Sequence, residues 1–278
     1  MDGRGHRGIL LIRSPLSTTS VLDEATEVVP LTSSWVGLLI LTTLPYRFLQ
    51  ALFVDQLIEV GDKAPSYGNL LGGTASMIVG AIVLAVWGRT VYARACRLAH
   101  GRGTPPGRET WRVPTAALAS YLLTSATMIL IGYLSVFTCI GVVVAAIFAG
   151  LAIGTAELNE RVSVVEPFRL IVRHARTATP LALVFVFFCA FFVALVNLAA
   201  AFGIGIWAVS GLSDFDAPRW QVLFTGSNRR YVLMLLAGAL MAIEPFWISA
   251  QVVFVRKAGA QERGDDLRAW FEELERAS

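Results

Sequence analysis

The chain has 278 residues, of which 55% are hydrophobic and 15% are charged, and its net charge at neutral pH is +3. Soluble domains carry about 25% charged residues, so this composition argues against an ordinary water-soluble domain and favours a membrane protein. Nearly all the positive charge is arginine. The arginines flank apolar segments instead of gathering in one polar domain, which argues against a nucleic-acid-binding protein.

Residues 1–34 form a polar N-terminal segment that contains one amphipathic stretch. In residues 20–30 the apolar side chains recur at helical spacing, at Val21, Leu22, Ala25, Val28 and Val29. The acidic side chains are assigned to the other face: Asp23, Glu24 and Glu27. Ser20 and Asp23 are suitably placed for an N-terminal capping pair. We therefore expect a helix that lies on the membrane surface before the first span.

Six long apolar stretches follow, each able to cross a hydrocarbon core of about 30 Å. They are residues 35–57, 69–93, 114–135, 137–156, 179–203 and 230–255. The predicted fold class is therefore all-α, a six-helix transmembrane bundle with amphipathic helices on its cytoplasmic surface. The chain divides into an N-terminal segment (1–34), a membrane domain (35–255) and a C-terminal segment (256–278).

Positive charge alternates between the gaps that separate these stretches. Eighteen of the 23 Lys and Arg residues fall in the two termini and in the 2–3 and 4–5 gaps, whereas four fall in the other gaps. Cytoplasmic loops carry an excess of Lys and Arg, so both termini are predicted to be cytoplasmic. Trp35, Trp87 and Trp111 stand at the predicted cytoplasmic edges, where tryptophan is enriched.

Further amphipathic segments lie on the same predicted side. Residues 163–174 carry an apolar stripe and a capping box, and Pro106–Val113 occupies the matching place before the third span with poorer periodicity. The chain thus resembles three repeats of a surface helix followed by a helical hairpin. In the tail, residues 263–278, the apolar side chains again follow helical spacing, at Leu267, Trp270, Phe271 and Leu274. We expect this helix either to lie on the bilayer or to dock to a cytoplasmic partner.

Short motifs in these surface segments resemble a bacterial multi-pass family. The first motif is Arg13-Ser14-Pro15-Leu16-Ser17 with Val21-Leu22-Asp23-Glu24-Ala25, and the second is Glu160-Arg161-Val162-Ser163-Val164-Val165-Glu166. The third is Phe254-Val255-Arg256 with Arg263-Gly264-Asp265-Asp266-Leu267. On these residues the chain resembles the membrane domain of glycerophosphoryl diester phosphodiesterase and related integral membrane proteins. It departs from that pattern at Ser20, where the family has Glu, and at Ile140-Gly141, where the family has Pro-Gly.

The resemblance implies a location in the bacterial inner membrane. In the name-giving proteins, phosphodiester chemistry is implied to belong to a separate soluble barrel domain, and about 22 residues follow the last predicted span here. The resemblance therefore carries over a membrane module and no catalytic residue.

Arg47 and Glu244 are the strongest candidates for an intramembrane polar pair. Arg47 follows Pro45 about 20 Å into the first span, and Glu244 precedes Pro245 about 16 Å from the cytoplasmic end of the sixth. An arginine at the bilayer centre costs at least about 2.5 kcal/mol, so it should face the interior and find a partner. The pair either only fixes helix packing or forms a site for a lipid headgroup, an ion or a proton.

Other polar and small residues have weaker patterns. Asp55, near the outer end of the first span, is a candidate acid at a solvated outer mouth, within reach of Arg229 or Arg230. Asn197 is expected to make an interhelical hydrogen bond. A stripe of small residues in the fourth span permits close helix approach, within the chain or between two copies: Ala146, Gly150 and Gly154.

The sequence predicts neither a catalytic constellation nor a metal or cofactor site. Cys96, Cys139 and Cys189 are isolated, and His6, His100 and His174 are far apart in the chain. The first hypothesis is a non-catalytic inner-membrane scaffold that docks a cytoplasmic or membrane protein partner, and the second is a small transporter or lipid-handling protein that uses Arg47 and Glu244. A third, an intramembrane enzyme, is the least favoured, because no nucleophile and base converge at one depth. Membrane lipids are expected partners under the first two hypotheses, and nucleic acid is not.

Overall fold

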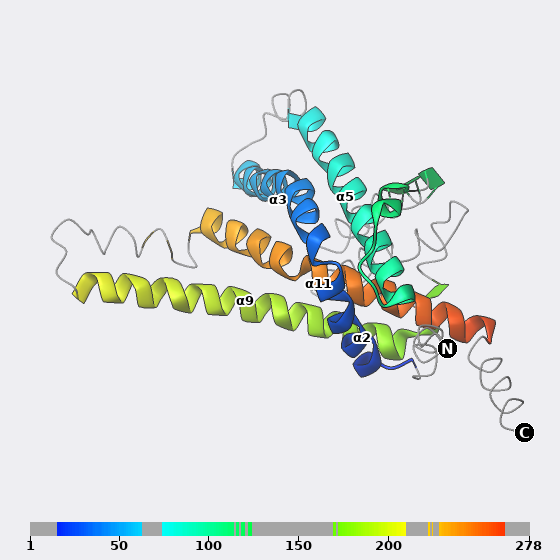
Figure 1. Cartoon of the computed structure of the whole chain (residues 1–278). Helices are drawn as coiled ribbons and strands as arrows, with labels where there is room; N and C mark the ends of the chain where they lie inside the picture. The colour runs from blue at the N-terminus through cyan, green and yellow to red at the C-terminus, as the bar shows by residue number, and fades with distance from the viewer. Residues whose placement is uncertain are drawn as a thin grey trace, which may run out of the picture. The chain divides into compact units, whose positions relative to one another are not determined.

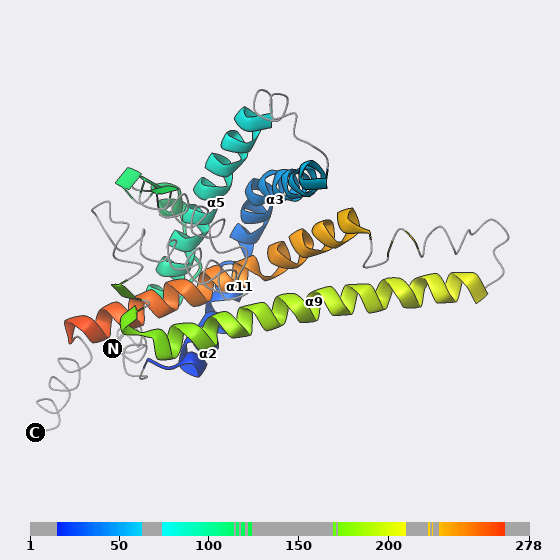
Figure 2. The ribbon, with the colours of Figure 1, turned by 180° about the vertical axis from the view of Figure 1, so that it is seen from behind.

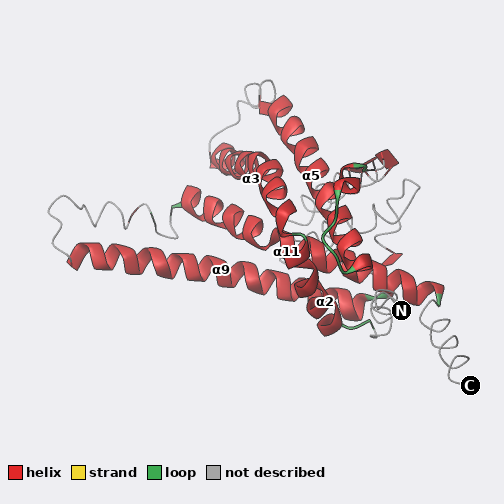
Figure 3. Ribbon diagram, in the orientation of Figure 1, coloured by secondary structure: helices red, strands yellow, loops and turns green. Residues whose placement is uncertain are grey.

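The computed structural model describes residues 16–62, 74–113, 169–170, 172–209 and 228–264, with residues 115–116, 118–119, 122–123, 222 and 224. The helices in these ranges are α2 (Thr18–Leu31), α3 (Ser33–Asp62), α5 (Thr74–Arg102), the short 3₁₀-helix η1 (Arg108–Trp111), α9 (Ala175–Val209) and α11 (Arg229–Arg263) (Figure 1). Within these ranges no residue forms a strand (Figure 3). The predicted all-α class is therefore confirmed for the described part of the chain.

Three segments are long and apolar enough to cross a membrane: Val79–Arg102, Ala175–Trp207 and Arg229–Glu262. A fourth is added if α2 and the first part of α3, which meet at a bend of 91°, count as one broken span. These correspond to the predicted first, second, fifth and sixth spans. Of the predicted third span only residues 115–116, 118–119 and 122–123 are described, and the predicted fourth span, with Ala146, Gly150 and Gly154, lies outside the described residues.

The described helices extend beyond the predicted apolar stretches. α5 continues to Arg102 and α11 to Arg263, because arginine is a good helix former and hydropathy marks only the part that suits lipid. Each helix ends before a glycine with positive φ, Gly103 at 64° and Gly264 at 68°. The N–H of Gly103 donates to the carbonyl of Ala99 at 2.7 Å, the closing bond of a left-handed helix cap.

α2 confirms the predicted amphipathic helix, but its cap is displaced from the predicted one. The N-cap is Ser17, and Ser20 completes the capping box as the third helical residue, so the predicted pairing of Ser20 with Asp23 was wrong. The helix ends at Thr32, whose hydroxyl donates to the carbonyl of Val28 at 3.1 Å. The carbonyl of Thr32 then accepts the N–H of Trp35, which starts α3 across the bend.

The chain forms two compact units. Unit 1 comprises residues 1–40, 86–184 and 245–278, and unit 2 comprises residues 41–85 and 185–244. Each of α3, α5, α9 and α11 contributes to both units, and their directions alternate: α3 and α9 begin in unit 1, whereas α5 and α11 end in it.

In unit 1 the C-terminal part of α11 is central. Residues 247–255 are buried on every face, as are Lys257 and Ala258. A helix that is buried all round lies inside a bundle. α2 and the C-terminal part of α5 lie beside this part of α11 in both views (Figures 1 and 2).

In unit 2 large apolar side chains face outward. Leu41, Phe187, Leu198 and Phe202 are each more than 60% exposed. Such an outward apolar face is typical of helices whose surroundings are hydrocarbon instead of water.

Candidate functional site

The structure brings Arg47 and Glu244 together in unit 2. The Nη2 atom of Arg47 on α3 lies 3.6 Å from Oε2 of Glu244 on α11, and the side chains are 15% and 6% exposed. Both residues lie near the middle of their helices, next to Pro45 and Pro245. A direct charge-assisted hydrogen bond measures about 2.7–2.9 Å, so this contact is an ion pair without a short hydrogen bond at those two atoms.

Asp55 is also paired in unit 2. Its two carboxylate oxygens accept from Nε of Arg229 and, at 2.9 Å, from Nε of Arg230. The carboxylate is buried, whereas the Arg230 side chain is 75% exposed. One carboxylate thus pairs with two guanidinium groups at the start of α11. The net charge of these three side chains is positive.

Asn197 of α9 lies beside this end of α11. Its side-chain carbonyl accepts from the hydroxyl of Tyr231 at 2.8 Å, and its amide donates to the carbonyl of Val193 at 3.0 Å. The expected interhelical hydrogen bond is therefore present.

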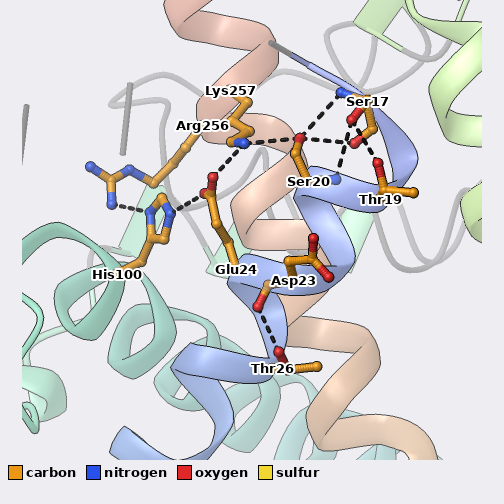
Figure 4. Close-up of polar contacts among 9 residues, drawn as sticks. All are labelled: Ser17, Thr19, Ser20, Asp23, Glu24, Thr26, His100, Arg256 and Lys257. Atoms are coloured by element: carbon orange, nitrogen blue, oxygen red, sulfur yellow. Dashed lines mark hydrogen bonds and ion pairs between the residues drawn. The ribbon is translucent and has the colours of Figure 1, made fainter. Parts of the chain in front are cut away.

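A buried polar cluster on three helices of unit 1 was not predicted from the sequence. Glu24 was assigned to the exposed face of its helix, and that assignment was wrong, because Glu24 is only 8% exposed. Its carboxylate contacts the ammonium of Lys257 on α11 and Nε2 of His100 on α5, the latter at 2.8 Å (Figure 4). These contacts join three helices of unit 1 through one carboxylate.

His100 links Glu24 to Arg256. Nη1 of Arg256 lies 2.6 Å from Nδ1 of His100. Because a guanidinium can only donate, Nδ1 is assigned as the acceptor of this bond. Nε2 then faces the carboxylate of Glu24 at 2.8 Å, so the ring connects a cation to an anion.

Lys257 and Ser20 form a pair that superficially suggests nucleophile chemistry. Nζ of Lys257 donates to Oγ of Ser20 at 3.0 Å. The same Nζ also contacts the carboxylate of Glu24, and it donates to Ser20 instead of accepting from it. The Ser20 hydroxyl donates to the carbonyl of Ser17 at 3.1 Å within the capping box (Figure 4). This geometry fastens α2 to α11 and does not activate a nucleophile.

A sequence signal for the burial of Glu24 existed. Val21, Ala25 and Val28 are buried at the spacing i, i+4 and i+7, and Glu24 occupies i+3 on the same face. An acid inside an apolar stripe must find a cation, and Lys257 is one of only two lysines in the chain. The sequence did not indicate which cation it would meet.

A second set of buried hydrogen bonds lies in unit 1. The hydroxyls of Thr32 and Tyr92 lie 3.1 Å apart, which ties the bend after α2 to α5. Sγ of Cys96 lies 3.2 Å from Oγ of Ser249, which in turn donates to the carbonyl of Pro245 at 3.0 Å. These contacts connect the helix bend, α5 and α11.

The described ranges contain no group of three or more His, Cys, Asp or Glu side chains that could hold a metal ion. Comparisons with protein-family models, with curated proteins and with solved structures find no match.

Proposed function

We propose that the protein is a non-catalytic multi-pass membrane module with six spans, which docks a protein partner on its arginine-rich side. The proposal places both termini on the cytoplasmic side of a bacterial inner membrane. It also keeps the resemblance to the membrane domain of glycerophosphoryl diester phosphodiesterase, which rests on the sequence motifs and implies a membrane module without catalytic residues.

The distribution of positive charge between the two units supports this topology. In the described ranges, eleven arginines fall in unit 1, as does Lys257: Arg89, Arg94, Arg97, Arg102, Arg108, Arg112, Arg169, Arg173, Arg176, Arg256 and Arg263. Arg47, Arg229 and Arg230 fall in unit 2. The helix ends next to the arginine-rich gaps are therefore gathered in one unit, as helix ends on a single side of a membrane would be.

The directions of the helices support an even number of spans between α5 and α9. α5 ends in unit 1 and α9 begins in the same unit, as expected if the chain between them crosses the membrane an even number of times. The predicted spans 114–135 and 137–156 satisfy this condition as one hairpin.

The proposal of a non-catalytic module rests on one observation: the buried charged side chains of the two units contact side chains of opposite charge. Glu24 is matched by Lys257 and His100, Asp55 by Arg229 and Arg230, and Glu244 by Arg47. Each contact joins different helices, and such pairs fix the register and rotation of helices in a bundle.

Partner docking is tested on the tail. The full chain is purified in native lipid discs, and co-purifying proteins are identified and compared with those of the variants Trp270→Ala/Phe271→Ala and Glu272→Ala/Glu275→Ala. The first variant removes the predicted apolar face and the second only the polar face. Loss of one stoichiometric partner in the first variant alone is the expected result, whereas an unchanged protein composition in all three samples would contradict docking through the tail.

One observation favours a second candidate, a lipid-handling or transport function at Arg47 and Glu244. The Arg47 side chain is 15% exposed near the middle of its helix, so a guanidinium, which suits phosphate and carboxylate groups, is not fully enclosed. A lipid or small anion that is retained by the purified protein and lost in Arg47→Ala would support this candidate. Its retention in that variant would remove the candidate.

A further inference from the structure

Three tryptophans that are distant in the chain meet in unit 1. The ring of Trp111 in η1 lies 5.1 Å from that of Trp35 at the start of α3 and 5.9 Å from that of Trp87 on α5, as measured between centroids. The Trp111 side chain remains 49% exposed. The three indoles therefore form an aromatic cluster with one open side.

The short helix η1 is fastened to α5 by its acidic residue. Nε of Arg94 donates to the carbonyl of Glu109 at 3.2 Å, and the Glu109 carboxylate pairs with Arg102. Thr110 is buried and donates to the carbonyl of Gly107 at 2.8 Å. η1 thus holds Trp111, with the exposed side chains of Arg108 and Arg112, in a defined position.

The charge around this cluster is strongly positive. From Arg89 to Arg112 the sequence holds six arginines and one acid, Glu109. Because Glu109 is already paired with Arg102, it does not neutralise Arg108 or Arg112. Arg108 precedes Trp111 by three residues in η1, the spacing at which side chains share one face of a 3₁₀-helix, and Arg112 directly follows Trp111.

We propose that Trp111, Arg108 and Arg112 form a binding site for the headgroup of an acidic phospholipid. The arginines bind the phosphate, for which the planar guanidinium is well suited, and the indole lies among the adjacent glycerol and acyl carbons. This inference rests on the membrane embedding in the proposed function and adds a specific ligand class to the arginine-rich side.

The position of the cluster favours a lipid over an acidic protein segment. Trp35 lies just after the 91° bend between α2 and α3, where a helix that crosses the membrane would give way to one that lies on its surface. Trp87 lies two residues before Arg89, the first charge after the apolar part of α5. All three indoles therefore mark the same boundary between apolar and charged segments, which is the level of lipid headgroups.

The test compares two double variants of the full chain in lipid discs. The discs contain phosphatidylcholine with increasing fractions of phosphatidylglycerol, and native mass spectrometry measures the phosphatidylglycerol retained on the protein. Arg108→Gln/Arg112→Gln is the test variant. Arg169→Gln/Arg176→Gln is the matched control, because it removes the same charge from two other exposed side chains of unit 1.

The test variant should bind phosphatidylglycerol at least about tenfold more weakly than the control, because it loses direct contacts to the phosphate in addition to the generic attraction that both variants lose. Equal losses in the two variants would show generic attraction and overturn the site. Equal retention by wild type and both variants would also overturn it, as would preferential binding of a soluble hexaglutamate peptide at Arg108 and Arg112.

A second measurement separates failure of the site from failure of the topology. The contribution of Trp111 to the fluorescence is obtained as the difference between the wild type and Trp111→Phe. It is measured in discs whose lipids carry bromine near the headgroup end of the acyl chains. Quenching that is stronger with brominated phosphatidylglycerol than with brominated phosphatidylcholine supports the site. Equal quenching by the two brominated lipids would overturn only the preference for an acidic headgroup. The absence of quenching by either lipid would overturn the interfacial position of Trp111 and, with it, the topology.

Discussion

Units 1 and 2 both contain buried charges, but they hold them differently. In unit 1 the hydrogen bonds of His100 to Glu24 and Arg256 measure 2.8 and 2.6 Å, and the carboxylate of Glu24 also contacts Lys257. In unit 2 Arg47 and Glu244 approach to 3.6 Å. The contacts of Glu24 link three helices, whereas the Arg47–Glu244 ion pair and the contacts of Asp55 with Arg229 and Arg230 link α3 to α11.

The two units also differ in what covers their helices. Residues 247–255 of α11, in unit 1, are buried all round, whereas α9 in unit 2 exposes Phe187, Leu198 and Phe202. A buried network stabilises only when nearly all of its members are satisfied, so unit 1 should respond sharply to the loss of one group. Unit 2 should rely more on its apolar contacts.

The largest effect is expected for Glu24→Ala in unit 1. The substitution leaves the Lys257 ammonium buried without its carboxylate, and it should lower the free energy of unfolding by about 3–5 kcal/mol. Thermal unfolding in lipid discs, followed by intrinsic fluorescence, measures the change. Glu27→Ala, an exposed acid on the same helix, is the control and should stay within about 0.5 kcal/mol. Similar losses in the two variants would refute the network.

In unit 2, Arg47→Ala should destabilise more in the presence of Glu244 than in the variant Glu244→Ala. A buried carboxylate without its cation costs more than the absence of both charges. We expect about 2 kcal/mol for the single change, less than for Glu24, because the pair is longer and Arg47 is partly exposed. A double-mutant cycle of unfolding free energies provides the measurement, and strictly additive losses would show that the two residues do not interact.

A smaller effect is expected for Tyr92→Phe, which removes one buried hydrogen bond to Thr32 in unit 1. The loss should be about 1 kcal/mol, because Thr32 still donates to the carbonyl of Val28. Tyr231→Phe removes the bond to Asn197 in unit 2, which is only partly buried, and should cost less. The reverse order of melting temperatures would contradict the proposed difference between the units.

The smallest effect is expected for Arg173→Ala at the surface of unit 1. Arg173 pairs with Glu262 at 3.0 Å, but its side chain is 47% exposed. Solvent screens such a pair, so the change in unfolding free energy should be below about 0.5 kcal/mol. A melting temperature that falls as far as that of Glu24→Ala would show that exposure does not distinguish the two contacts.

The sequence alone determined the features that depend on neighbouring residues. Apolar length and helical periodicity predicted the all-α class, the apolar parts of α3, α5, α9 and α11, and the amphipathic helix α2. Charge distribution predicted the topology, which remains to be tested by experiment. These properties follow from a local pattern, because a helix closes its own hydrogen bonds and its faces are set by a period of 3.6 residues.

Tertiary structure decided which side chains meet. Glu24 and His100 are 76 residues apart in the chain, and no local pattern indicates that α2 turns its acid toward α5. Trp35, Trp87 and Trp111 could be assigned to an edge of the membrane but not to one cluster. The physical reason is that such contacts depend on the rotation of each helix about its axis and on its crossing angle. Both are fixed by the packing of all the helices together.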